Sequence, residues 1–363
     1  DGSDGSNELT HMLLDIIDEM HLLQPSSNLQ LSRKTPDVIL KHTLEVVRKG
    51  YGFPSIFNAD AVVEEQIRQG KTFEDARAGG CSGCVEVGAF GKEAYILTGY
   101  FNLSKVLELA LHNGVDPRTG VAIGPATGNP DDFSTFDDLF AAFDAQLRHL
   151  VDIKIRGNQI IERLYATEMP APFLSVLIDD CIATGLDYNA GGARYNNNFI
   201  QAVGIGSITD SLAAIKTLVF GQRDITLEKL VEIMGADFAD NEPLRQRLAN
   251  KMPRYGNDDD DADQLMIRVF EAGFSAIDGR PTTKGGHYRI EMLPTTCHVY
   301  FGSVCGASAD GRHAGMPLSE GISPVQGADR NGQIVVLRSV GAMDEVRTGG
   351  TLLKIKFTPL ILE

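Results

Sequence analysis

The chain has few cysteines and no long uninterrupted apolar run. Its five cysteines are an odd and sparse set for 363 residues, which fits a reducing compartment rather than a disulfide framework. No window reaches the roughly 18 consecutive apolar residues of a membrane-spanning helix. The first residues also lack the basic and apolar regions of a signal peptide. We therefore expect a cytoplasmic protein that does not enter a membrane.

Basic residues are also scarce. Lysine and arginine number 33 against 49 aspartates and glutamates, which gives a formal net charge of -16. No basic stripe is available to bind nucleic acid or an anionic membrane surface. With 43% hydrophobic and 23% charged residues, the composition is that of a globular protein with one large core or two modest ones. Small molecules are the expected ligands.

Hydrophobic periodicity and capping residues predict a chain rich in helices. The expected helices cover residues 9–23, 37–49, 59–69, 103–112, 134–167, 209–220, 227–234, 242–251 and 261–277. The expected strands cover residues 95–100, 288–301, 334–340 and 351–357, while 115–133 should be irregular and 173–181 a short buried strand or helix. Because no internal repeat or flexible linker divides the chain, we treat residues 1–363 as one domain.

The most informative segment is G-G-C-S-G-C-V-E-V-G at residues 79–88. In an extended segment, side chains two residues apart point to the same side. Cys84 and Glu86 are therefore expected to face one substrate together. The sulfur would be the reacting atom and the carboxylate a proton acceptor.

The spacing of Cys81 and Cys84 allows two other interpretations. C-x-x-C is half of a zinc site and is also the spacing of a redox dithiol. A zinc site needs a second pair with a similar short spacing, which Cys297 and Cys305 do not have. We expect no bound metal.

Other motifs have ordinary structural interpretations. A cysteine hydrolase would need a histidine base such as His112, His287 or His298, although packing or surface roles are simpler for each of them. The glycine-rich segment 189–196 lacks the order of a phosphate-binding loop. The acidic run at 258–263 lacks the ligand pattern of a calcium loop and suits the first turn of a helix.

Several separated motifs match one known family in the same order. G-C-V-E at 83–86 resembles the cysteine loop of the glycyl radical enzymes, the pyruvate formate-lyase-like family. The segments 189–196, 255–260, 310–324 and 349–353 resemble motifs that follow there in the same sequence. The resemblance covers essentially the whole chain, so coincidence is a poor explanation.

The resemblance implies an α/β fold, a portion of a ten-stranded α/β barrel with the cysteine loop at its centre. It also implies radical chemistry that a separate activating enzyme begins with S-adenosylmethionine and an iron–sulfur cluster. No cofactor is expected to bind this chain directly, and we expect a homodimer.

The loop itself points to one branch of the family. Pyruvate formate-lyase has two adjacent cysteines here, whereas Cys84 is followed by Val85 and Glu86, as in the dehydratases and C–X lyases. By resemblance, Cys84 would form a thiyl radical that takes a hydrogen atom from the substrate, and Glu86 would act as general acid or base. Tyr100 falls where related eliminases place a substrate-contacting tyrosine, although it also suits a half-buried strand aromatic.

The sequence around the loop also suggests a substrate. Residues 83–93 and 98–100 resemble the trans-4-hydroxy-L-proline dehydratases within this branch. Dehydratases of diols, lyases of isethionate or choline, and a formate acetyltransferase-like enzyme are the alternatives. Each of these acts on a small polar molecule.

One expected motif does not occur in residues 1–363. The family stores its radical on the glycine of an R-V-x-G-Y loop, which we expect after Glu363. The family also has a long helical region before the position of Asp1. We therefore expect this chain alone, without a C-terminal glycyl radical domain, to be unable to complete the reaction. A non-catalytic fragment or scaffold is the alternative interpretation.

Overall fold

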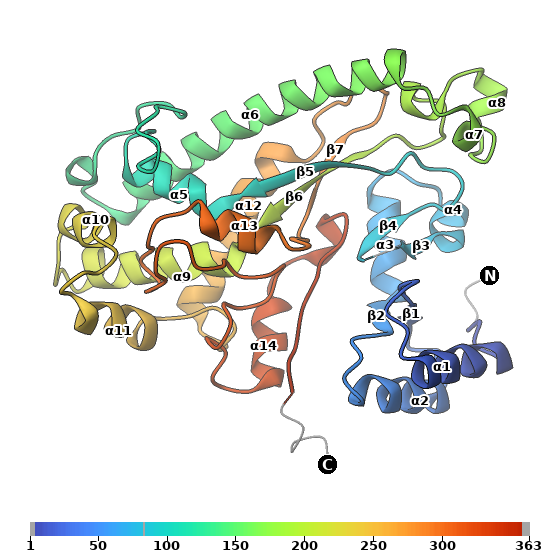
Figure 1. Cartoon of the computed structure of the whole chain (residues 1–363), viewed down its shortest axis with the longest axis horizontal. Helices are drawn as coiled ribbons and strands as arrows, with labels where there is room; N and C mark the ends of the chain where they lie inside the picture. Colours follow the sequence, from blue (N-terminus) through green and yellow to red (C-terminus); the bar gives the residue numbers. More distant parts are fainter. Residues whose placement is uncertain (1–3, 83, 358–363) are drawn as a thin grey trace.

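The computed structural model describes residues 4–82 and 84–357, in which helices surround three small sheets (Figure 1). Gly83 of the predicted cysteine loop lies outside the described residues. The helices are α1 (Glu8–Met20), α2 (Asp37–Arg48), α3 (Ala59–Arg68), α4 (Phe73–Ala78), α5 (Leu103–Leu111), α6 (Phe136–Glu168), α7 (Pro172–Ser175), α8 (Cys181–Thr184), α9 (Ile205–Ile215), α10 (Leu227–Gly235), α11 (Glu242–Lys251), α12 (Asp260–Ile277), α13 (Cys297–Ser303) and α14 (Gln333–Val340). The strands are β1 (Asn28–Leu31), β2 (Ser55–Asn58), β3 (Gly80–Ser82), β4 (Glu86–Gly88), β5 (Ile96–Asn102), β6 (Asn198–Val203) and β7 (Tyr288–Glu291).

The three parallel strands β5, β6 and β7 form the central sheet. Ile200 and Ala202 of β6 face the main hydrophobic core together with Phe143 and Leu147 of α6, and all four side chains are buried. Helix α6 runs along the upper edge of the molecule in Figure 1. It begins at a capping box in which the Thr135 hydroxyl accepts from the N–H of Asp138, as its sequence predicts.

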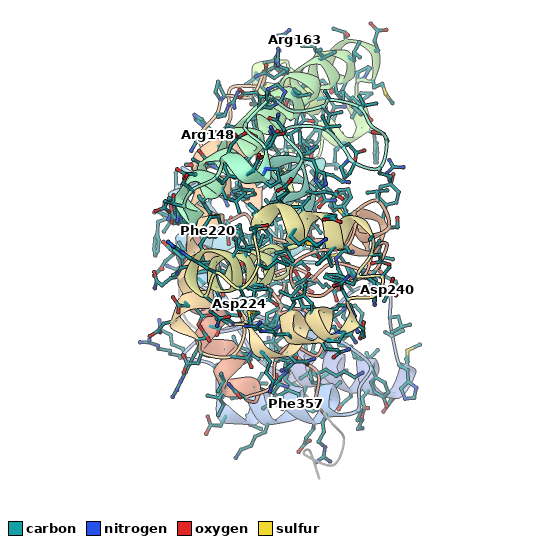
Figure 2. The ribbon with its side chains drawn as sticks, turned by 90° about the vertical axis from the view of Figure 1, so that its left-hand side faces the viewer. Arg148, Arg163, Phe220, Asp224, Asp240 and Phe357 are labelled. Carbon is teal, nitrogen blue, oxygen red and sulfur yellow. The ribbon has the colours of Figure 1, made fainter. Side chains whose placement is uncertain are left out.

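The C-terminal region lies at the opposite end of the molecule from α6. In the view turned by 90°, Arg163 and Arg148 of α6 lie in the upper part and Phe357 lies near the bottom (Figure 2). Between these ends, residues 310–352 run back across the body of the protein to reach the central sheet.

A buried ion pair connects this returning segment to the core. Asp210 of α9 accepts hydrogen bonds from the N–H of Tyr255 (2.9 Å) and from the Arg254 guanidinium (2.9 Å). The Tyr255 hydroxyl then donates to the carbonyl of Ile322 (2.7 Å), and the N–H of Ile322 donates to the carbonyl of Leu352 (2.9 Å). The motifs at 255–260 and 310–324 therefore hold residues 349–352 in place.

The predicted helices in the first two thirds of the chain are confirmed with small shifts at their ends. Helix α9 is an exception, since it begins at Ile205 and not at residue 209. Asp210 is consequently not a capping residue but a buried member of the helix. At 173–181 the predicted short helix is confirmed as α7, but its predicted burial is wrong, because Phe173 is 80% exposed.

The predicted strands near the C-terminus are mostly wrong. Residues 334–340 form helix α14, in which Val336 and Val340, four residues apart, reach the core. Strand β7 ends at Glu291, and helix α13 follows where the strand was expected to continue. Of residues 351–357, Thr351 makes an isolated bridge to Met292. Apolar β-branched runs favour strands locally, but tertiary packing decides their structure.

Among the described residues, no helix is both long enough and apolar enough to cross a membrane.

Candidate active site

Strands β3 and β4 form a short antiparallel hairpin, residues 80–88, which we call the cysteine hairpin. Cys81 pairs with Val87, and Ser82 pairs with Glu86. Cys84 lies in the turn between the strands and is exposed. The prediction that Cys84 and Glu86 share one side of an extended segment is therefore wrong in detail, because the chain reverses at Cys84.

The reversal nevertheless brings the Glu86 carboxylate to the tip of the hairpin. Its Oε2 atom accepts hydrogen bonds from the N–H of Cys84 (2.9 Å) and from the N–H of Val85 (3.1 Å). These two donors stabilise the negative charge of the carboxylate and fix its position. The turn thus places an acid or base group directly beside the cysteine.

The surroundings of Cys84 keep its thiol protonated. Partial burial raises the pKa of the Cys84 thiol, and the negative charge of Glu86 raises it further. A cysteine nucleophile works as the thiolate and is found beside positive groups. The site therefore favours a reaction of the S–H group over attack by a thiolate.

Cys81 has a different environment from Cys84. Its side chain is buried against Val62 and Val87, and burial, assisted by the charge of Glu65, raises its pKa to about 12. All five cysteines are free thiols. Within residues 4–82 and 84–357, no group of three or more His, Cys, Asp or Glu side chains is arranged to hold a metal ion.

The cysteine hairpin lies against two consecutive glycines from the far end of the chain. The N–H of Val87 donates to the carbonyl of Gly349 (3.4 Å). A Cβ atom on Gly350 would lie 2.3 Å from the carbonyl oxygen of Val85, and the φ of Gly350 is +136°. Only glycine fits so close an approach of two backbones, which explains the G-G-T sequence at 349–351.

The same two glycines join the hairpin to the central sheet. The N–H of Gly349 donates to the carbonyl of Ile290 (2.8 Å), and the N–H of Met292 donates to the carbonyl of Gly350 (3.0 Å). A Cβ atom on Gly349 would lie 2.2 Å from the ring of Phe199 in β6. Residues 349–350 are thus held between the hairpin and the end of β7.

Tyr100 lies at the carboxyl end of the sheet, where ligands of parallel α/β sheets bind. A bulge between Leu97 and Tyr100 shifts the register of β5, so that Tyr100 pairs with Gln201 of β6. Gln201 in turn pairs with Glu291 of β7. The Tyr100 hydroxyl is 2.7 Å from the Thr295 hydroxyl, so Tyr100 is a half-buried strand aromatic with a polar partner.

Sequence reasoning did not identify Thr295, Gln201 or Glu291. No local sequence pattern marks these residues. Strand β6 was not predicted, and the strand predicted over 288–301 gave no indication that β7 ends at Glu291. A positive φ of 46° at Thr295, which is rare for a β-branched residue, is visible only in the structure. Such backbone strain is frequent at functional sites.

Of the three histidines considered as bases, His112 and His287 have other contacts. His112 Nδ1 lies 2.8 Å from the carbonyl of Glu108, and the His287 backbone N–H donates to Asn197. His298 Nδ1 is buried and has no partner among the described residues. The acidic run at 258–263 begins α12, where the Asp259 side chain caps the helix, as predicted.

The chain belongs to the pyruvate formate lyase-like family. The family model described as "Pyruvate formate lyase-like" matches residues 1–302, and a second model, "Glycine radical", matches residues 318–363. We predicted that the latter residues belong to the barrel domain, and the R-V-x-G-Y sequence is not among residues 1–363. The division of the chain into domains stays a prediction.

Two curated relatives are dehydratases. The chain is 52% identical over 363 residues to trans-4-hydroxy-L-proline dehydratase of Clostridioides difficile, covering 100% of this chain and 46% of that protein. It is 32% identical to (2S)-3-sulfopropanediol dehydratase of Klebsiella oxytoca, covering 98% of this chain and 44% of that protein. The chain therefore spans less than half the length of these relatives.

Solved structures of the family have the same fold. The Clostridioides difficile hydroxyproline dehydratase with bound trans-4-hydroxy-L-proline matches with a TM-score of 0.98 and 51% identity, over 100% of this chain and 46% of that one. The glycerol-bound, B12-independent glycerol dehydratase of Clostridium butyricum matches with a TM-score of 0.96 and 34% identity, over the same shares. The predicted α/β class is confirmed, while closure into a ten-stranded barrel stays a prediction.

The close approach at Gly350 leads to a first prediction. We expect Gly350→Ala to displace the cysteine hairpin, because the new methyl group would collide with the Val85 carbonyl. The loss of stability should combine about 1–3 kcal/mol of backbone strain with about 1–3 kcal/mol of overpacking. Denaturant unfolding of the full-length polypeptide measures the change.

Gly332→Ala is the matched control for that variant. Gly332 also has a positive φ, of +94°, but its Cβ would meet nothing within 4 Å. This control reports backbone strain alone. Equal losses in the two variants would contradict the close packing inferred at Gly350.

The charge of Glu86 leads to a second prediction. Because this negative charge raises the pKa of the Cys84 thiol, Glu86→Gln should lower that pKa and leave more thiolate at a given pH. Below the pKa, alkylation of Cys84 should become faster, because a larger fraction of the thiol is ionised and the thiolate is the nucleophile. Rates are read by mass spectrometry in unactivated protein across pH 7–9.

Glu64→Gln, at an exposed position of α3, should leave the alkylation rate of Cys84 unchanged. A slower or unchanged rate in the Glu86→Gln variant would show that the carboxylate does not act on the thiol as inferred.

Proposed function

We propose that the polypeptide carrying this chain is a glycyl radical dehydratase, with trans-4-hydroxy-L-proline as its substrate. The observation that carries the proposal is the tip of the cysteine hairpin, where the Glu86 carboxylate accepts a hydrogen bond from the backbone N–H of Cys84 (2.9 Å). The 52% identity to a hydroxyproline dehydratase over the whole chain supports the choice of substrate.

The chemistry of dehydration makes use of both groups. A thiyl radical at Cys84 takes a hydrogen atom from a carbon beside a heteroatom, so that an S–H bond forms and a C–H bond breaks. The hydroxyl group on the adjacent carbon then leaves with a proton as water. The carbon radical that remains takes a hydrogen atom back from the Cys84 thiol, which restores the thiyl radical.

Hydroxyproline has the required arrangement of atoms. The carbon beside its ring nitrogen is adjacent to the carbon that carries the hydroxyl group. Glu86, within hydrogen-bond reach of the substrate, would act as the general acid or base for the proton transfer that accompanies departure of the hydroxyl group. Tyr100, whose hydroxyl already has Thr295 as a partner, would contact the substrate from the end of the sheet.

The radical has to reach Cys84 from a glycine. We include in the proposal a separate activating enzyme that installs this glycyl radical with S-adenosylmethionine and an iron–sulfur cluster. The match of residues 318–363 to the "Glycine radical" model supports this part. A homodimer and a cytoplasmic location also belong to the proposal.

A cysteine hydrolase is the less favourable alternative. Its nucleophile would need a lowered pKa and a nearby basic group. The charge acting on Cys84 is instead that of the Glu86 carboxylate, which raises the pKa of the thiol. A non-catalytic scaffold would require neither the paired groups nor the close packing of the hairpin.

A substrate comparison under strict anaerobiosis tests the proposal. The full-length polypeptide is activated and offered hydroxyproline, glycerol, 1,2-propanediol, isethionate and choline in turn. We expect kcat/KM for hydroxyproline to exceed the other values by about 10²-fold or more, because polar sites reject substrates that leave their groups unpaired. Glu86→Gln should lower kcat by about 10²–10⁴-fold, with Glu64→Gln as the control.

Two outcomes would contradict the proposed function. Preference for a diol, isethionate or choline would retain the radical mechanism and overturn the substrate. A stable glycyl radical without turnover of any of these compounds would support a scaffold or an enzyme for a different class of substrate.

A further inference from the structure

Glu291 is a fully buried residue close to the cysteine hairpin. It is the last residue of β7 and its side chain is 0% exposed. Its neighbour across the sheet, Gln201, is 1% exposed and pairs in turn with Tyr100. A buried carboxyl group therefore stands in the same row as the candidate substrate-binding tyrosine, and the proposed chemistry does not use it.

The contacts of Tyr95 indicate the protonation state of Glu291. The Tyr95 hydroxyl lies 3.1 Å from the carbonyl oxygen of Gly349 and 3.4 Å from Oε1 of Glu291. A phenol has one proton, and a carbonyl oxygen can only accept. If Tyr95 donates to Gly349 at the shorter distance, a hydrogen bond with Glu291 requires Glu291 to donate.

No positive group compensates a charge on Glu291. It belongs to no ion pair among the described residues, and its Oε2 atom has no hydrogen-bond partner there. The Lys71 ammonium, which acts on the neighbouring Glu65, is bound to Glu93 (2.9 Å) and to Gln69 (2.7 Å). An unpaired buried carboxylate is costly, whereas a protonated carboxyl group avoids most of that cost.

The groups that face Glu291 strengthen this conclusion. Glu86 approaches from β4, Glu65 from α3, Cys84 from the turn and Tyr95 from the segment before β5. None of them is cationic. Burial raises the pKa of Glu291 well above its usual range, and the charge of Glu86 raises it further.

We propose that Glu291 is an uncharged carboxylic acid that acts as a positioning residue for Glu86. The Glu291 carboxyl group donates a hydrogen bond to the Tyr95 hydroxyl, and the Tyr95 hydroxyl donates to the carbonyl of Gly349. These two bonds fix the position of Gly349 against the hairpin. Because Glu291 is neutral, Glu86 is the group that carries the negative charge beside Cys84. Two carboxyl groups in different environments thus take different roles. The role rests on the proposed function of Glu86, whereas the protonation state does not.

Infrared spectroscopy of the unactivated full-length protein tests the protonation state directly. At neutral pH, the difference between wild type and Glu291→Gln should show the C=O stretching band of a protonated carboxylic acid, which shifts in D₂O. Glu228→Gln, an exposed position on α10, is the control and should remove no such band. Loss of carboxylate bands alone in the Glu291→Gln spectrum would overturn the proposal.

Tyr95→Phe provides a second variant in case Glu291→Gln fails to fold. It keeps the ring that stacks on Phe199 at 4.0 Å between centroids and removes the hydroxyl group. The acid band should remain in this variant but change frequency, because its hydrogen-bond partner is gone. An unaltered band would show that Glu291 and Tyr95 are not bonded.

The pH profile of the activated enzyme tests the positioning role. In Glu291→Gln, the acid limb of kcat/KM should keep its wild-type midpoint, because one neutral group replaces another. A shifted midpoint would contradict the proposal, since it would show that the substitution changes the charge near the active site. Glu291→Leu should lose about tenfold or more in kcat/KM relative to Glu291→Gln, because it leaves Tyr95 without a partner.

Discussion

The backbone contact between the cysteine hairpin and residues 349–350 is the constraint on which the candidate active site depends. A two-stranded hairpin has little stability of its own, and its tip carries Cys84, the proposed radical site. Gly350 passes so close to the Val85 carbonyl that a side chain would not fit. The same segment is hydrogen-bonded to the end of β7. The position of Cys84 relative to the sheet is therefore set by a segment more than 260 residues further along the chain.

The electrostatics of the site follow from that packing. The hairpin brings Glu86 over a buried region that also contains Glu65 and Glu291. Partial burial and the charge of Glu86 raise the pKa of the Cys84 thiol and disfavour thiolate chemistry. The proposed hydrogen-atom transfer needs an S–H group and a separate proton acceptor, and Cys84 and Glu86, two residues apart, are our candidates for these roles.

Much of the fold and part of the site could be predicted from local signals. Helix α6 was predictable because Thr135 and Asp138 form a capping box before a long amphipathic run. Cys84 and Glu86 were predictable because the glycine-rich loop and the motif are contiguous in sequence. Helix α14 could not be predicted, because its valines favour a strand locally. The segment is helical because Val336 and Val340 are buried in the core. Gln201 and Glu291 were missed because strand pairing alone brings them to the site, and Thr295 was missed because only its contact with Tyr100 does so.

The central claim is that Cys84 abstracts a hydrogen atom from the substrate and is not a polar nucleophile. The most direct test compares the anaerobically activated full-length protein with its Cys84→Ser and Cys81→Ala variants. We predict that all three show the glycyl radical signal in electron paramagnetic resonance, that Cys81→Ala turns over hydroxyproline, and that Cys84→Ser does not. Turnover by the Cys84→Ser variant would contradict the account.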